Sequence, residues 1–218
     1  MSRPRVGVLA LQGDFARHRA SLEALGVEVR LVRRAVDLED LEALILPGGE
    51  STTMLTLIEA QGLRPALEAF VSRQPVLGTC AGVILLGHGG ARLPAASFGV
   101  LDVEVERNAY GRQIDSFSAE VEAPVLGGRF PAVFIRAPRL GRVGAGVEVV
   151  ARRIAGAGVA AEPVGVRSGR VVGLCFHPEL TRDLRFHRWF LTEVAGLTLD
   201  ALEGSASEVG ATPAREGA

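Results

Sequence analysis

Strand-length apolar runs that alternate with helical patterns are the feature that most constrains the fold of this chain. Four such runs are "VGVLAL" (6–11), "VEVRLV" (27–32), "ALILP" (43–47) and "VVGLCF" (171–176). Helical spacing follows the first run, and a second helix is expected over 51–61, ending at Gly62. Apolar strands separated by amphipathic helices are typical of a parallel sheet. We therefore predict an α/β fold with an open, mostly parallel central sheet and helices on both faces.

The middle of the chain predicts an antiparallel β extension of this sheet. Its short segments alternate in polarity and are broken by glycine or proline, as in "FGVLDVEVER", "RQIDSFSAEVE", "AVFIRAP" and "GVEVVAR". Residues 183–194 have the pattern of a closing helix, and the small polar residues from Gly204 onward indicate disorder. Because 218 residues suit one hydrophobic core, we expect a single domain over 1–197 and a largely disordered tail over 198–218.

Composition argues against several classes of function. The formal net charge is -1, which gives no reason to expect binding to nucleic acid or to an anionic membrane. All 24 Lys/Arg residues are arginine, so the chain can form neither a lysine Schiff base nor a Walker phosphate loop. No cluster of metal ligands stands out, and we expect neither a metal nor a cofactor. A small molecule or a protein is the expected partner.

The sequence indicates a cytoplasmic protein. The apolar run near the N-terminus, about six residues, is shorter than the core of a signal peptide. The longest uncharged stretch, 74–91, is interrupted by polar residues and glycines and does not have the continuity of a membrane span. The two cysteines stand in different contexts and suggest no disulfide framework.

The segment "GTCAG" (78–82) predicts a nucleophile at Cys80. It lies between a predicted strand and a predicted helix, where a strained turn needs small neighbours such as Gly78 and Gly82. The N–H groups and dipole of the following helix would favour a thiolate at Cys80. The alternative is that Cys80 only fills the core, as free cysteines often do. Cys175, in "VVGLCF" without such glycines, is expected to be core filling.

The segment "CFHPEL" offers the base that a nucleophilic thiol needs. His177 and Glu179 are two residues apart, and Pro178 holds the backbone extended, so both side chains would point to the same side. His177 could then accept the thiol proton while Glu179 orients it. Alternatively, the segment is a polar loop after a strand. Both it and the cysteine turn follow predicted strands, at the sheet edge where open α/β folds bind ligands.

The remaining three histidines are interpreted as structural. His18 and His187 occupy what look like exposed helix positions, and His88 follows the helix after Cys80. None of them lies, as His177 does, at the end of a predicted strand.

The segment "LILPGGEST" (44–52) predicts an oxyanion hole. Gly48 and Gly49 follow a buried strand, and their backbone N–H groups could converge with that of Ala81. Glu50 and Ser51 could bind polar groups of a substrate, or they could simply cap the following helix.

Together these residues resemble the class I (triad) glutamine amidotransferases, which have a flavodoxin-like sheet. More narrowly, the sequence is similar to the glutaminase subunits of pyridoxal 5'-phosphate synthase. The similarity rests on six blocks over residues 5–196, in the order "LALQGDFARH", "LILPGGESTTM", "GTCAGVILL", "ERNAYGRQIDSF", "FIRAP" and "CFHPEL".

The resemblance implies hydrolysis of L-glutamine to glutamate and ammonia, with the ammonia passed to a separate synthase subunit that builds the cofactor. It implies that Cys80 is the nucleophile, His177 the base and Glu179 its orienting group. The positions that match glutamine-binding residues are Gly49, Glu50, Ser51, Arg107, Ile135 and Arg136. Gln12 matches a residue near the active site and the partner contact. Without the resemblance, the two arginines could be solvated charges and Gln12 a turn residue.

Three other functions remain open at this point. The chain could be a glutaminase that serves a different synthase, although "PGGESTTM" and "RNAYGRQIDSF" argue against it. It could be a free-standing cysteine hydrolase with the same turn, such as a γ-glutamyl hydrolase. It could also be a catalytically silent binding subunit that keeps the fold.

Overall fold

The computed structural model describes residues 3–89, 93–107, 116–154 and 161–199. Most of the tail expected to be disordered, and part of "ERNAYGRQIDSF", lie outside the described residues.

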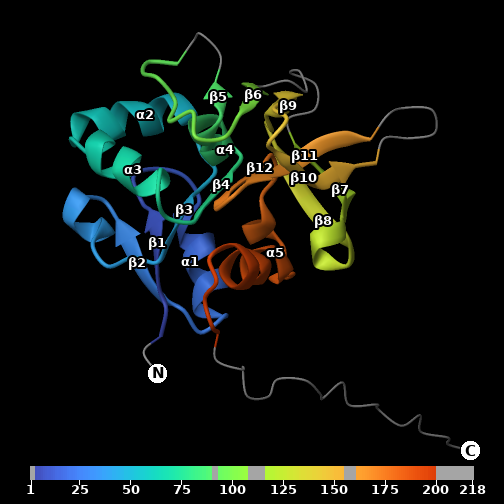
Figure 1. Ribbon diagram of the computed structural model, residues 1–218, viewed down its shortest axis with the longest axis horizontal. Helices are drawn as coiled ribbons and strands as arrows, with labels where there is room; N and C mark the ends of the chain where they lie inside the picture. The colour runs from blue at the N-terminus through green and yellow to red at the C-terminus, as the bar shows by residue number, and fades with distance from the viewer. Residues whose placement is uncertain (1–2, 90–92, 108–115, 155–160, 200–218) are drawn as a thin grey trace, which may run out of the picture.

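Within the described residues, nine strands form the main sheet, in the order β2-β1-β3-β4-β12-β11-β10-β7-β8 (Figure 1). Neighbours from β2 to β12 are parallel, and neighbours from β12 to β8 are antiparallel. The strands are β1 Arg5–Leu9, β2 Glu28–Val32, β3 Ala43–Leu46, β4 Val76–Thr79, β7 Ser116–Ala123, β8 Gly128–Ile135, β10 Glu148–Arg153, β11 Glu162–Ser168 and β12 Val171–Leu174. The predicted parallel sheet with an antiparallel extension is confirmed.

Part of the middle segment belongs to a second sheet of three strands. It has the order β5-β6-β9, with β5 His88–Gly89, β6 Val103–Glu106 and β9 Arg139–Val143. The prediction that the whole middle segment extends the main sheet was therefore wrong for "FGVLDVEVER". Val103 and Val105 in this segment are buried, while Glu104 and Glu106, which alternate with them, are exposed, so the alternating pattern indicated a strand without indicating its sheet.

Helices cover both faces of the main sheet, with α1 and α5 on one side and α2 and α4 on the other (Figure 1). The helices are α1 Phe15–Glu23, α2 Ser51–Ala60, α3 Arg64–Val71, α4 Ala81–Leu86 and α5 Arg185–Trp189. The predicted closing helix is present but changes at Phe190 into a single π-helical turn, η4 Phe190–Val194. Helix α3, which was not predicted from the sequence, begins with a proline in its first turn.

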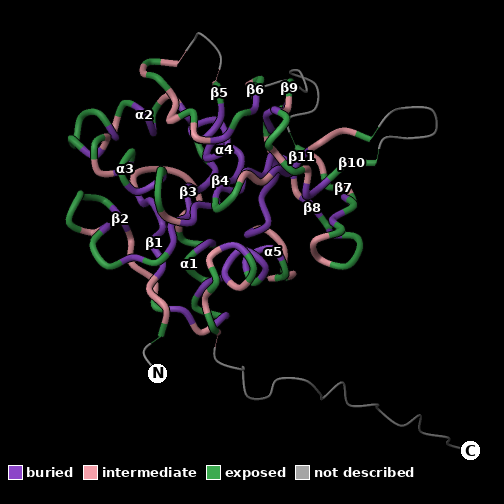
Figure 2. Tube along the Cα trace, viewed as in Figure 1, coloured by how far each residue is buried: buried purple, intermediate pink, exposed green. Residues whose placement is uncertain are grey.

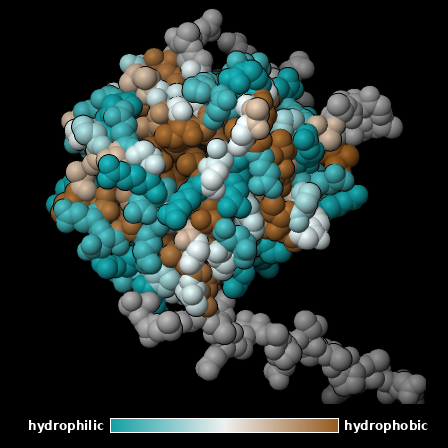
Figure 3. All heavy atoms as spheres, viewed as in Figure 1, coloured by the Kyte–Doolittle hydropathy of each residue, from teal (hydrophilic) through white to brown (hydrophobic). Residues whose placement is uncertain are grey.

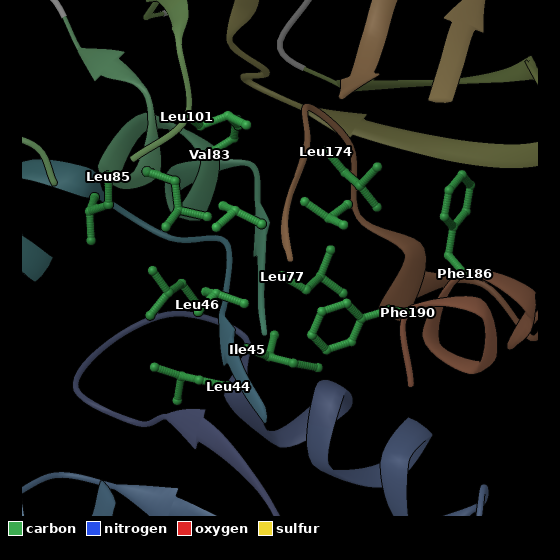
Figure 4. Close-up of a cluster of buried hydrophobic side chains, with 14 of the residues drawn as sticks. Leu44, Ile45, Leu46, Leu77, Val83, Leu85, Leu101, Leu174, Phe186 and Phe190 are labelled. Carbon is green, nitrogen blue, oxygen red and sulfur yellow. The ribbon is translucent and has the colours of Figure 1, made fainter. Parts of the chain in front are cut away.

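The core lies on both sides of the central parallel strands β3, β4 and β12, whose residues are all buried (Figure 2). Figure 4 shows leucine and isoleucine side chains of β3 and β4 packed between α4 on one side and the aromatic residues of α5 and η4 on the other. Strands buried on both faces read as continuous apolar runs, which is why the sequence indicated them clearly. Polar side chains cover much of the visible surface between smaller apolar areas (Figure 3).

None of the helices in the described part of the chain is long and apolar enough to pass through a lipid bilayer.

The direction of the parallel strands brings distant segments together at one edge of the sheet. β1, β3, β4 and β12 all point the same way, so the loops that follow them meet at their carboxyl ends. These loops hold residues 12–14, 48–50, 80 and 177. This edge is where open α/β sheets bind ligands.

Candidate active site

Cys80 occupies a strained turn between β4 and α4. Its backbone has φ 48 and ψ -102, a left-handed conformation that a residue other than glycine rarely adopts. The Cys80 N–H donates to the carbonyl of Leu174 on β12, at 2.8 Å, which ties the turn to the sheet. Strain of this kind is concentrated at functional sites.

The two glycines beside this turn are required by close backbone contacts. A methyl group on Gly78 would lie 2.6 Å from the carbonyl carbon of Gly82, and one on Gly82 would collide with the backbone oxygen of Leu46. The interpretation of "GTCAG" as a tight turn between strand and helix is confirmed. The Cys80 side chain is 6% exposed and points toward the end of β8, where its sulfur lies 3.7 Å from the Ile135 carbonyl oxygen.

His177 and Glu179 contact each other directly, as the sequence predicted. His177 Nδ1 lies 2.7 Å from Glu179 Oε1, and the His177 N–H donates to the carbonyl of Val133 at 2.8 Å. Pro178 starts a 3-10 turn, η3 Pro178–Leu180, that brings Glu179 to the imidazole nitrogen. The two side chains therefore meet through a turn rather than through an extended strand.

The electrostatics of this pair favour a protonated imidazole above an ionised carboxylate. Burial lowers the pKa of His177, but its interactions with the Cys80 side chain and with Glu179 outweigh burial and raise that pKa to about 10. Burial raises the pKa of Glu179, but His18 and His177 hold it well below its usual range. His177 Nε2 is buried and meets no group at normal hydrogen-bond geometry among the described residues. This nitrogen is therefore available to exchange a proton with a bound ligand.

The Gly48–Gly49 turn packs between the loop after β1 and His177. A methyl group on Gly48 would collide with the His177 ring, and one on Gly49 would collide with the side-chain oxygen of Gln12. Gln12 accepts a hydrogen bond from the Glu50 N–H at 2.8 Å. Gln12 is therefore not only a turn residue, because its side chain also contacts the Gly48–Gly49 turn.

Glu50 caps helix α2 and also faces an arginine. Partial burial raises the pKa of Glu50, but hydrogen bonds from the Thr52 hydroxyl and the Thr53 N–H outweigh it and lower the pKa to about 2. Arg107 reaches the same carboxylate at 3.3 Å. The capping interpretation is confirmed, and the carboxylate still borders the cavity described next.

A cavity of about 210 Å³ lies at this edge of the sheet. Its lining residues are Gln12, Gly49, Glu50, Ser51, Cys80, Ile84, Arg107, Ile135, Arg136 and His177. The structure thus brings the predicted substrate-binding residues together with the thiol and the imidazole. Its volume is below the range of drug-sized sites and suits a ligand as small as an amino acid.

Three predicted residues lie behind this lining, and one lining residue was not predicted. Gly48, Ala81 and Glu179 do not border the cavity, whereas Ile84 on α4 does. Ile84 was missed because an apolar residue in a buried helix gives no sign that it faces a ligand. Arg136 has φ 41, a further left-handed residue at the cavity.

The prediction that His18 and His187 are exposed was wrong. Both are 0% exposed, because the helices α1 and α5 that carry them pack their histidine faces against the sheet edge rather than toward solvent. His18 Nε2 lies 3.2 Å from Glu179 Oε2. His88 is half exposed and faces Asp102 at 3.6 Å.

The other thiol is buried in the core. Cys175 is 0% exposed, and burial raises its pKa well above its ordinary value, so its interpretation as core filling is confirmed. Among the residues that the structure describes, no three His, Cys, Asp or Glu side chains are grouped so as to hold a metal ion.

Fold and site together define an α/β protein with a cysteine, a histidine and a glutamate at the carboxyl edge of a parallel sheet. The model of the SNO glutamine amidotransferase family matches residues 8–196. The chain belongs to this family.

Curated relatives match almost over their whole length. A protein of Thermus thermophilus named pyridoxal 5'-phosphate synthase subunit PdxT is 50% identical over 195 residues, which is 88% of this chain and 98% of the relative. A protein of the same name from Pseudothermotoga lettingae is 47% identical over 194 residues, with 88% and 96% covered.

Solved structures show the same fold. A crystal structure described as a glutamine amidotransferase is 47% identical with a TM-score of 0.79, and the match covers 88% of this chain and 99% of that one. The PurLQS structure from Thermotoga maritima matches with a TM-score of 0.63 at 17% identity, covering 88% and 99%, and shares the fold.

Proposed function

We propose that this chain is a glutaminase that hydrolyses L-glutamine to L-glutamate and ammonia and passes the ammonia to a partner subunit that makes pyridoxal 5'-phosphate. The observation that carries the proposal is the placement of Cys80 and His177 in one small cavity, with Glu179 directly behind His177. The names of the curated relatives support the choice of synthase. The catalytic unit is a single domain over 1–197, and the family match over 8–196 supports this boundary.

In the first step the Cys80 thiolate attacks the side-chain amide carbon of glutamine. The imidazolium of His177, supported by Glu179, is the counterpart of that thiolate, which fits a pKa of His177 raised to about 10. The attack makes a tetrahedral intermediate with a negative oxygen. Backbone N–H groups of Gly49 and Ala81, with those near Gly48, stabilise this oxygen.

In the second step His177 donates its proton to the amide nitrogen, ammonia leaves, and a γ-glutamyl thioester remains on Cys80. The now neutral His177 takes a proton from water, and the resulting hydroxide attacks the thioester. Glutamate leaves, and the thiolate and imidazolium are restored. One imidazole, whose position Glu179 maintains, thus gives a proton to the departing ammonia and regains one from water.

The rim of the cavity carries the charges needed to bind an amino acid. Glu50 is ionised and faces the cavity, so it can pair with the α-ammonium group of glutamine. Arg107 and Arg136 can pair with the α-carboxylate, and Ser51 offers a hydroxyl. Ile84 and Ile135 pack against the aliphatic part of the substrate.

The partner subunit has a second role in this proposal. Gly48 and Gly49 form a turn that can rotate a peptide group, and Gln12 contacts the same turn. Docking of the synthase near Gln12 sets the oxyanion hole and raises the turnover. The free thiols Cys80 and Cys175 fit a reducing compartment such as the cytoplasm.

The test is ammonia release from glutamine by the chain alone, with the synthase subunit, and with the synthase subunit and Cys80→Ala. Cys175→Ala is the matched control, because it removes the other buried thiol. We expect release that rises with the partner, is abolished by Cys80→Ala and persists in Cys175→Ala.

Three other results would contradict the proposal. Release that ignores the partner indicates a free-standing hydrolase, and no release under any of these conditions indicates a binding subunit or a different synthase. Residual turnover in Cys80→Ala would refute the assignment of the nucleophile.

A further inference from the structure

Two histidines outside the cavity form a buried polar chain that ends at the triad. His18 Nδ1 lies 3.1 Å from His187 Nε2, and His18 Nε2 lies 3.1 Å from the Thr79 hydroxyl. The same His18 Nε2 lies 3.2 Å from Glu179 Oε2, the carboxylate oxygen that His177 does not use. The side chains of His18 and Glu179 are each 0% exposed.

The contacts of these side chains indicate which histidine nitrogens carry a proton. Glu179 is ionised and can only accept, so a proton on His18 Nε2 is needed to avoid a lone pair facing the carboxylate. His18 Nδ1 then serves as the acceptor, and His187 donates to it from Nε2. Burial lowers the pKa of His187 to about 3, which keeps His187 neutral. His187 Nδ1, the far end of the chain, has no hydrogen-bond partner among the described residues.

This series of buried polar contacts joins the elements that carry the triad. His18 is on α1, Thr79 ends β4 directly before Cys80, Glu179 is on η3, and His187 is on α5. Only His18 contacts both the residue before the nucleophile and the carboxylate behind the base, within the part of the molecule that the structure describes. A displacement of His18 would therefore reach both sides of the reacting pair.

We propose that His18 is a positioning residue of the glutaminase reaction, which holds the second oxygen of Glu179 and the Thr79 hydroxyl so that His177 stays aimed at Cys80. His187 supports it by fixing which nitrogen of His18 carries the proton. The inference rests on the proposed function, since it assigns a role within that same site. In this proposal the catalytic residues act together with two further histidines, in the order His187, His18, Glu179, His177 and Cys80.

A positioning role differs from a merely structural role in what it changes. If His18 only filled space, replacing it would lower stability and leave the reactivity of folded protein unchanged. If it positions Glu179, replacing it lowers kcat and slows the reaction of Cys80 with an alkylating reagent, while KM for glutamine stays constant. Cys175 is 0% exposed, so alkylation of the folded protein reports on Cys80.

The experiment compares wild type with His18→Leu, His18→Gln and Leu22→Ala, each in the complex with the synthase subunit. Leucine removes the ring nitrogen that contacts Glu179 and Thr79, whereas the glutamine amide can replace it. Leu22 is a fully buried core residue on the same helix, one turn further on, so Leu22→Ala measures the effect of lost packing alone. Glutamine turnover is measured for each complex. The alkylation rate by iodoacetamide at pH 7 is measured for each chain, with thermal unfolding as the check of folding.

We expect His18→Leu to lower kcat and the alkylation rate about 10- to 100-fold, the scale of a lost polar interaction with a charged group. KM should change by less than about twofold, the small change expected when ground-state binding is kept. His18→Gln should recover most of both rates, and Leu22→Ala should lower only the unfolding temperature. Rates of folded His18→Leu equal to those of wild type overturn the inference, as does a loss matched by Leu22→Ala.

A second variant covers the case in which His18→Leu does not fold. His187→Leu removes the donor to His18 Nδ1 but leaves the contact between His18 and Glu179 in place. We expect the alkylation rate to fall, by less than in His18→Leu. An alkylation rate in His187→Leu equal to that of wild type would contradict the proposed role of His187. Because alkylation needs neither glutamine nor partner, a wild type that alkylates but releases no ammonia would refute the proposed function separately from the inference.

Discussion

His187 should make the protein less stable in weak acid, by an amount that the structure sets. Burial and the nearby His18 lower the pKa of His187 to about 3, against an ordinary value of 6.5. Between these values the unfolded chain binds a proton at His187 that the folded chain does not bind. The free energy of unfolding therefore falls as the pH falls from about 6.5 toward 3, and this loss is absent above pH 6.5.

The size of the loss follows from the distance to the unfolded pKa. A pH of 5 is about 1.5 units below the ordinary pKa of a histidine, and each unit is worth about 1.4 kcal/mol. At pH 5 His187 therefore lowers the free energy of unfolding by about 2 kcal/mol. With a urea dependence of about 2 kcal/mol per molar, this shifts the unfolding midpoint by about 1 M.

The assay is urea unfolding followed by circular dichroism at pH 7 and pH 5, for wild type and His187→Gln. The glutamine amide can still donate to His18 but does not titrate. Other groups, such as His177 with its pKa raised to about 10, contribute equally to both proteins. We expect wild type to lose about 2 kcal/mol more than the variant between the two pH values. His88→Gln, which replaces a half-exposed histidine, is the control and should behave as wild type. Equal losses in wild type and His187→Gln would refute the reasoning.

Two further predictions concern the triad and the turn that holds it. Glu179→Gln removes the carboxylate that supports the imidazolium, so the pKa of His177 should fall from about 10 and kcat should fall about 10⁴-fold, the scale for an orienting carboxylate in a triad; an unchanged titration of His177 by NMR would count against this. Gly82→Ala places a methyl group against the Leu46 carbonyl and should cost about 1–3 kcal/mol in urea unfolding. Gly146→Ala, which meets open space, should cost little, and equal losses for the two would contradict the close packing.

The sequence by itself determined the parts of this protein whose cause is local. Strands buried on both faces must be continuously apolar, so β1, β3, β4 and β12 were visible in the sequence. The turn at Cys80 needs a small residue at Gly78 and at Gly82, and that spacing was visible too. The two-residue spacing of His177 and Glu179 placed both on one short segment.

Only the tertiary structure decided what lies around these motifs. The middle segment shows the same alternation whichever sheet its strands join, so the sequence did not reveal that β5, β6 and β9 form a second sheet. Ile84 is one of several apolar residues in α4, and only its place beside the cavity sets it apart.

The clearest case is the chain of histidines behind the triad. His18 and His187 look like ordinary polar helix residues, because nothing near them in the sequence pairs with them. Their contacts are 61 and 169 residues apart in the chain and exist only once the sheet edge, α1 and α5 have packed together. The local sequence specifies which conformation a segment can adopt, whereas the partners of a buried polar group are chosen by the whole fold.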